Sequence, residues 1–101
     1  MIVVVSIFDL SIEYAQSLKE KRMVVKSLKD RLHNTFNVSV NEVALQDVHQ
    51  RARLAISFVA HDHAGADSML EKLEHFIQSS TDAVLGMFTS EKLEFDPVAD
   101  L

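Results

Sequence analysis

The stretch that decides the fold is Ser17 to Phe36, SLKEKRMVVKSLKDRLHNTF. Its apolar residues recur at helical spacing, which predicts one amphipathic helix. Ser17 stands three residues before Glu20, the capping-box pattern in which each side chain accepts a hydrogen bond from the other residue's backbone N–H. The apolar stripe of this helix consists of Leu18, Val25, Leu28, Leu32 and Phe36.

The same stretch carries most of the positive charge of an acidic chain. Residues 17–36 hold six basic and two acidic residues, whereas the whole chain has ten basic and 15 acidic residues and a net charge of −5 at pH 7. At about 100° per residue, most of these cations line one flank of the stripe, and Lys21 lies closer to the apolar side. The predicted binding surface for RNA or another partner is Lys19, Lys21, Arg22, Lys26 and Lys29.

Length and composition predict one soluble globular domain. The chain has 101 residues, of which 48% are hydrophobic and 25% charged, and these proportions are ordinary for a soluble protein with one core. It contains no cysteine, which excludes disulfides and thiolate metal sites and fits a reducing compartment. The apolar start MIVVVSIFDL has no basic segment and is interrupted by Asp9, so it predicts neither a signal peptide nor a membrane span. We therefore expect a cytoplasmic protein.

The segments around this helix predict the fold class. Strand patterns cover residues 1–12, 38–45, 51–60 and 83–95, and a second amphipathic helix follows Asp62, which suits an N-cap. We expect a bulge near Asn41–Glu42, because the apolar parity changes there. The order βαββαβ with right-handed crossovers predicts an α+β, ferredoxin-like split β-α-β domain. We expect a four-stranded antiparallel sheet with both helices on one face, formed by residues 1–96, and a tail over residues 97–101.

Three segments carry a resemblance to a known family: SLKEKR (17–22), FNVSVNEV (36–43) and QRARLAISFV (50–59). Through them the chain resembles the YlxP-like family, small bacterial proteins classed as a domain of unknown function. The resemblance implies a ferredoxin-like fold and a bacterial cytoplasmic setting. Members are often encoded beside translation and ribosome-maturation genes, which implies a role with RNA or the ribosome. The family tends to have an aromatic residue before the QR pair, where this chain has His49.

The basic residues of the first helix allow two interpretations. In the first, they meet the phosphates of RNA, free or in a ribosomal particle, each neutralising one backbone charge. In the second, they form a solvated helix flank without a partner, which Asp67, Glu71 and Glu74 could neutralise if the neighbouring second helix faces it.

The sheet face turned away from the helices predicts a different kind of contact. On the strand 51–60 it presents Ala55, Ser57 and Val59, and Val3 and Val5 extend it. This face lacks the glycines and aromatics on which RNA-recognition modules stack bases. Exposed apolar faces often mark interfaces. The alternative to RNA binding is therefore a homodimeric structural or regulatory module, unless the chain's own termini cover the face.

Histidines give the only pattern typical of a metal site. His61 and His63 stand one residue apart, as in a chelating pair, but Asp62 between them suits the helix cap and no third ligand has a fixed place. We therefore expect exposed loop histidines and no metal.

Catalysis is not predicted. Asp9 with Glu13, and Asp47 with His49, offer groups for acid–base chemistry, yet the chain has no phosphate loop, nucleophile elbow or dinucleotide fingerprint. We expect a non-enzymatic protein without a cofactor or a small-molecule substrate.

Overall fold

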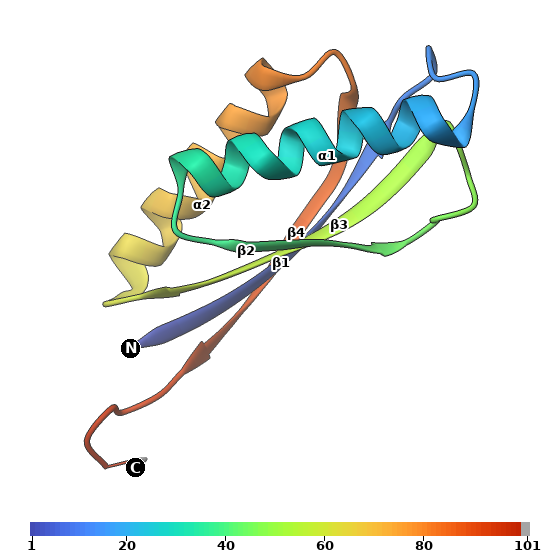
Figure 1. Ribbon diagram of the computed structural model, residues 1–101. Coiled ribbons are helices and arrows are strands. Elements are labelled where there is room, and N and C mark those ends of the chain that lie inside the picture. Colours follow the sequence, from blue (N-terminus) through green and yellow to red (C-terminus); the bar gives the residue numbers. More distant parts are fainter. Residues whose placement is uncertain (100–101) are drawn as a thin grey trace.

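The computed structural model describes residues 1–99 and confirms the βαββαβ order. The strands are β1 (Ile2–Ser11), β2 (Ser39–Ala44), β3 (Arg51–Ala60) and β4 (Val84–Glu94), and the helices are α1 (Leu18–Thr35) and α2 (His63–Ser80). The strands form one antiparallel sheet in the order β2-β3-β1-β4. Both helices lie on the same side of this sheet (Figure 1). The predicted α+β, ferredoxin-like arrangement is therefore confirmed.

Both helices begin at the residues that the sequence predicts. Ser17 Oγ accepts a hydrogen bond of 3.1 Å from the backbone N–H of Glu20, and Asp62 Oδ1 accepts one of 2.7 Å from Gly65. The return bond differs from the predicted capping box, because the carboxylate of Glu20 accepts from the backbone N–H of Gln16 at 2.7 Å. Each cap satisfies donors at the first turn that have no partner within the helix.

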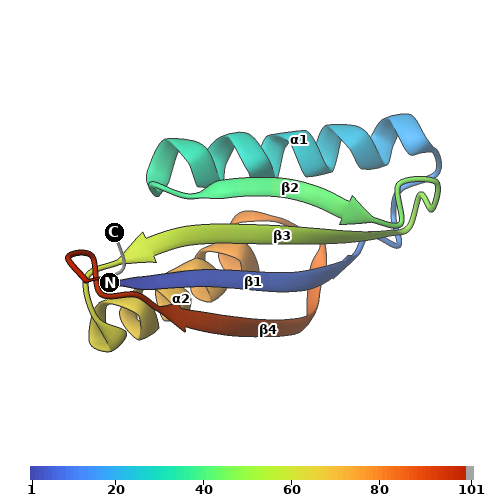
Figure 2. The ribbon, with the colours of Figure 1, turned by 90° about the horizontal axis from the view of Figure 1, so that it is seen from below.

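The core fills the space between the helices and one face of the sheet. Strands β1 and β3 contribute alternate residues to it, as the two-residue period of a strand requires. Figure 2 shows α1 beside β2 at one edge and α2 behind β1 and β4. Phe36 and Phe76 join the helices by an edge-to-face contact with ring centroids 5.3 Å apart. The fully buried aliphatic side chains include Leu28, Leu32, Leu54, Ile56, Leu73 and Ile77.

Two irregularities change which side chains face the core. The register of β2 on β3 shifts between Glu42 and Ala44, slightly beyond the predicted position. The register of β4 on β1 shifts between Phe8 and Leu10, and the sequence pattern does not predict this bulge. Leu85 and Leu93 are eight positions apart, so in a regular strand their side chains would lie on the same face. Because of the bulge in β4, Leu85 pairs with the core residue Leu10, whereas Leu93 pairs with Val3, whose side chain lies on the opposite face.

Candidate nucleic-acid interface

Four cations lie along one side of α1, and we call Lys19, Arg22, Lys26 and Lys29 the basic flank; the first three are exposed and Lys29 is half-buried. Arg22, Lys26 and Lys29 border a groove of about 300 Å³ between α1 and β2, with Val25, Asp30 and Glu42. The flank of α1 that faces α2 is formed by other residues, among them Met23 and Arg31. Arg22, Lys26 and Lys29 therefore lie on the β2 side of α1. Figure 2 shows α1 at the β2 edge of the molecule, with α2 further along the sheet behind β1 and β4.

Lys21 does not belong to this surface, and its prediction as a binding residue is wrong. Its side chain is fully buried, with 0% exposed. The ammonium lies 2.9 Å from Glu42 Oε2 and donates a hydrogen bond to the carbonyl of Leu45. A buried cation needs such partners, because transferring its charge out of water costs several kcal/mol. Removing one partner of a buried pair typically lowers the free energy of unfolding by about 3–5 kcal/mol. Lys21 therefore ties the first turn of α1 to the end of β2.

The residue that receives this contact has an unusual backbone. Leu45 has φ 66° and is the only non-glycine residue with positive φ between Met1 and Ala99. This left-handed conformation is disfavoured for a residue with a Cβ. The Lys21 hydrogen bond to the Leu45 carbonyl therefore helps to hold the β2–β3 loop in this conformation.

Carboxylates of α1 and β2 neutralise the basic flank only in part. Lys26 Nζ lies 2.8 Å from Asp30 Oδ2, one helical turn further along. This hydrogen bond raises the pKa of Lys26 and lowers the pKa of Asp30. Glu42 borders the groove, but its charge is matched by Lys21.

The acidic residues of α2 do not reach the basic flank. Asp67 pairs with Lys92 on β4, and Glu71 and Glu74 form no ion pair with α1. Among residues 1–99, Lys19, Arg22 and Lys29 have no carboxylate oxygen within 4.0 Å. The interpretation of the flank as a surface paired with α2 is therefore wrong.

The face of the sheet opposite the helices is aliphatic and uncovered by either helix; we call it the open face. Ala55, Ser57 and Val59 lie on it, as predicted, in register with Ile7, Val5 and Val3 of β1. Val59 is 65% exposed, Val5 41% and Leu93 56%. The phenylalanines of the central strands, Phe8 and Phe58, are buried on the helix side. Stacking of RNA bases on aromatics of β1 and β3 is thus excluded on the open face.

An ion pair between Asp9 and Arg53 lies at one end of the open face. Asp9 on β1 stands opposite Arg53 on β3, whose Nε and Nη2 donate hydrogen bonds of 2.6 and 3.1 Å to its two carboxylate oxygens. Arg51 lies 3.6 Å from the same carboxylate. The Arg53 hydrogen bond, with the charges of both arginines, holds the pKa of Asp9 below its usual value.

Comparison with known proteins places the chain in a family. The family model described as "Protein of unknown function (DUF503)" matches residues 3–89, from β1 into β4. The chain belongs to the DUF503 family. It is also 40% identical over 65 residues to the uncharacterized protein YlxP of Bacillus subtilis (strain 168), a match that covers 64% of this chain and 71% of that protein. The resemblance to the YlxP-like family is thus confirmed, and the family description names no activity.

The histidines of this DUF503 protein do not gather into a metal site in the described residues. Within residues 1–99, no three His, Cys, Asp or Glu side chains could hold one metal ion. His63 instead lies with its Nε2 3.6 Å from Glu94 Oε2 on β4. Neither helix in this part of the chain has the length and apolar character needed to cross a bilayer.

In residues 1–99, no hydrogen bond joins Asp9 to Glu13 or Asp47 to His49, the two pairs considered for acid–base chemistry. Asp9 is held by Arg53 and Arg51, and Glu13 lies in the exposed β1–α1 connection. Asp47 and His49 are exposed in the β2–β3 loop. The carboxylate of Asp9 accepts hydrogen bonds from Arg53, and its lowered pKa makes it a weak general base at neutral pH.

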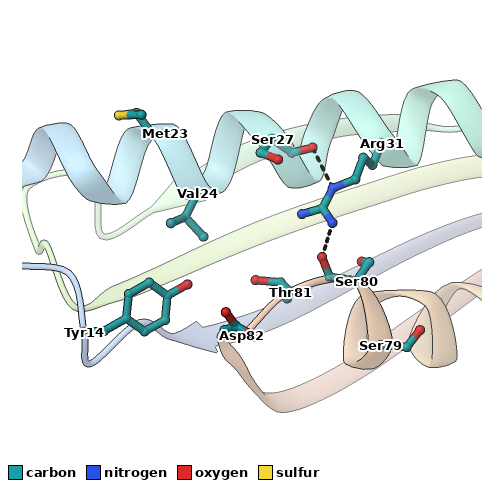
Figure 3. A pocket seen from close by; sticks show the side chains of 9 residues that line it. All are labelled: Tyr14, Met23, Val24, Ser27, Arg31, Ser79, Ser80, Thr81 and Asp82. Atoms are coloured by element: carbon teal, nitrogen blue, oxygen red, sulfur yellow. Dashed lines mark hydrogen bonds between the residues drawn. The ribbon is translucent and has the colours of Figure 1, made fainter.

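A second groove, of about 490 Å³, lies between the helices and is not predicted from the sequence (Figure 3). Arg31 reaches across it from α1 and donates hydrogen bonds to its own helix at Ser27 O (3.3 Å) and to the carbonyl of Ser80. Ser80 is the last residue of α2, where carbonyls have no partner within the helix and the dipole favours a cation. Arg31 therefore caps α2 from the neighbouring helix. A contact between residues 49 apart in the chain leaves no local signal in the sequence.

Proposed function

We propose that this protein is a non-catalytic module that binds RNA, free or in a ribosomal particle, through its basic flank. The observation that carries the proposal is the position of Lys19, Arg22 and Lys29, which have no carboxylate partner in residues 1–99 and lie along one outer edge. The whole chain has a net charge of −5. Outside residues 17–36 the chain holds four basic residues (10 − 6) and 13 acidic ones (15 − 2), so the field of the whole molecule favours phosphates at this edge over the rest of the surface.

The chemistry of such a contact is charge neutralisation. Residues 22, 26 and 29 follow one another by four and three positions, so their side chains project from adjacent turns of one helix flank. Each cation that meets a phosphate releases a counterion, and for three or four contacts with a single strand the slope of log K against log salt is about −2 to −3. Binding of this kind positions RNA without reading its sequence.

A charge-reversal experiment tests the proposal against a matched control. Arg22→Glu and Lys72→Glu change the net charge equally and replace exposed helical cations, one on the basic flank and one on α2. Fluorescence anisotropy with a labelled single-stranded RNA, measured across a salt series, gives the affinity. We expect Arg22→Glu to weaken binding about tenfold at about 50 mM salt, and Lys72→Glu to change it less than about twofold.

Two results would contradict RNA binding at this surface. One is the absence of any RNA binding by the unaltered protein at low salt. The other is an equal loss in the two variants, because that would show a response to net charge alone. Circular dichroism of both variants controls for folding.

We further propose that two copies of the chain associate through their open faces. The supporting observation is the row of exposed aliphatic side chains on β1, β3 and β4. The charged residues among them are Arg51, Arg53, Asp9 and Glu91, two of each sign. This face is therefore neutral on an anionic molecule, and a second copy meets no net repulsion there.

Two equally exposed apolar residues allow a matched test of this association. Val59 lies on the open face and Met23 on α1, and each is 65% exposed. Size-exclusion chromatography with light scattering should show a dimer for the unaltered chain and for Met23→Glu, and a monomer for Val59→Glu. A strictly monomeric unaltered chain at high concentration would exclude the dimer.

A further inference from the structure

The open face carries its charges and its aliphatic residues in separate rows across β1 and β3. Three rows are apolar or small, since Val3 pairs with Val59, Val5 with Ser57, and Ile7 with Ala55. The next row holds Asp9 opposite Arg53. Their side chains are 17% and 35% exposed, so both charges can still be reached from outside.

We infer that two copies stack open face to open face about a two-fold axis that runs along the strands between β1 and β3, so that Asp9 of each copy meets Arg53 of the other. This inference rests on the dimer proposed above and specifies its geometry. It assigns to the Asp9–Arg53 pair a role in selecting the register of association.

The reason lies in what each possible axis places in contact. An axis along the strands places β1 of one copy over β3 of the other and keeps every residue at the same height along the strands. Aliphatic residues therefore meet aliphatic residues. Asp9 of each copy then lies over Arg53 of the other. An axis across the strands exchanges the two ends of the face and sets Arg53 over the Val3–Val59 end. Burying a charge against an aliphatic row is unfavourable because no partner replaces its water.

The geometry of packed sheets is compatible with the first arrangement. Aligned sheets pack about 10 Å apart with strand directions within about 30° of each other. The long guanidinium side chain of Arg53 can cover the sideways offset that this angle creates. Small residues such as Ala55 and Ser57 at the centre of the face allow the close approach.

Mixing two charge variants tests this register directly. In Arg53→Asp, positions 9 and 53 are both acidic, and in Asp9→Arg they are both basic. Two copies of the same variant would therefore place like charges together, so each variant alone should self-associate at least about tenfold more weakly. In a mixture, acidic rows face basic rows, and dimers of one chain of each kind should form with nearly the original affinity. The pairing within each chain stays broken in the mixture, so repair of the fold cannot explain a recovery.

Cross-linking provides a second measurement that needs no charge change. The chain has no cysteine, so Val5→Cys and Ser57→Cys each introduce a single thiol. With the axis along the strands, position 5 of one copy lies over position 57 of the other. A short bismaleimide should therefore join mixed Val5→Cys and Ser57→Cys proteins faster than Val5→Cys joins to an excess of Met23→Cys protein.

The outcomes separate this inference from the proposed dimer. Recovery on mixing, together with the 5-to-57 cross-link, supports the register. A dimer of the unaltered chain that shows neither result overturns the register and leaves the dimer standing. A monomeric unaltered chain overturns both.

Discussion

The two faces of β1 and β3 consist of alternate residues of the same strands, and both are rich in aliphatic side chains. On the helix side, Phe8, Leu54 and Ile56 are completely buried, whereas Val59 on the open face is mostly exposed. Ion pairs join neighbouring elements on both sides of the sheet, and Lys21–Glu42 on the helix side can be compared with Asp9–Arg53 on the open face. The comparison teaches that an apolar strand pattern alone does not say whether a face stabilises the fold or remains free for a partner.

The largest effect on stability should come from truncating the covered face. Leu54→Ala removes buried methyl groups and leaves a cavity, which should lower the free energy of unfolding by about 2–5 kcal/mol. Val59→Ala on the same strand should change it by less than about 0.5 kcal/mol, because the side chain is exposed. Urea unfolding at low protein concentration, where association does not contribute, measures both. Equal losses would show that the open face is also part of the core.

The buried ion pair should come next. Lys21→Met leaves the Glu42 carboxylate without its ion-pair partner and the Leu45 carbonyl without its donor, so the free energy of unfolding should fall by about 3 kcal/mol. The double variant Lys21→Met with Glu42→Leu should recover much of this loss, because no unpaired charge remains. A double variant as unstable as Lys21→Met would contradict this account. The same urea experiment provides the comparison.

The ion pair of the open face should have the smallest effect, and it should depend on pH. The pKa of Asp9 is lowered in the folded state, mainly by the Arg53 hydrogen bond. Its contribution is therefore complete above the unfolded-state pKa, about 4, and is lost as the pH falls through the lower folded-state pKa. Arg53→Gln should be less stable than the unaltered chain at pH 7, by less than Lys21→Met.

Stability measurements at acid pH test whether Arg53 acts through the charge of Asp9. The difference between Arg53→Gln and the unaltered chain should shrink as the pH falls below about 4, since Asp9 becomes protonated in both proteins. Thermal unfolding between pH 7 and pH 2.5 follows the difference. A gap that stays constant over this range would show that Arg53 acts through packing.

Periodicity was sufficient to predict the six elements and their order. The two-residue period of β1 and β3 and the helical spacing of Leu28 and Leu32 depend only on which side of an element is buried. The helix starts were also predictable, since Ser17 and Asp62 cap through contacts three residues away.

Contacts between distant segments could not be predicted in the same way. Lys21 lies at helical spacing from the buried residues Val25, Leu28 and Leu32, so its burial could be predicted from the sequence. No sequence pattern indicates that Glu42 is its partner. The β4 bulge depends on pairing with β1, and the Arg31 contact with Ser80 depends on how the helices pack. The basic flank was predicted as a group, and only the fold shows that α2 does not neutralise it.

The central position of β1 has a consequence for synthesis of the chain. Among the strands of this sheet, β1 is synthesised before the others, and it pairs with β3 on one side and β4 on the other. One edge of the apolar segment IVVVSIF thus has no partner until the last strand emerges, and late pairing between distant segments slows folding and exposes nascent chains to aggregation. Any premature stop before Val84 should yield a fragment with a bare hydrophobic edge, which other nascent chains can extend as a template.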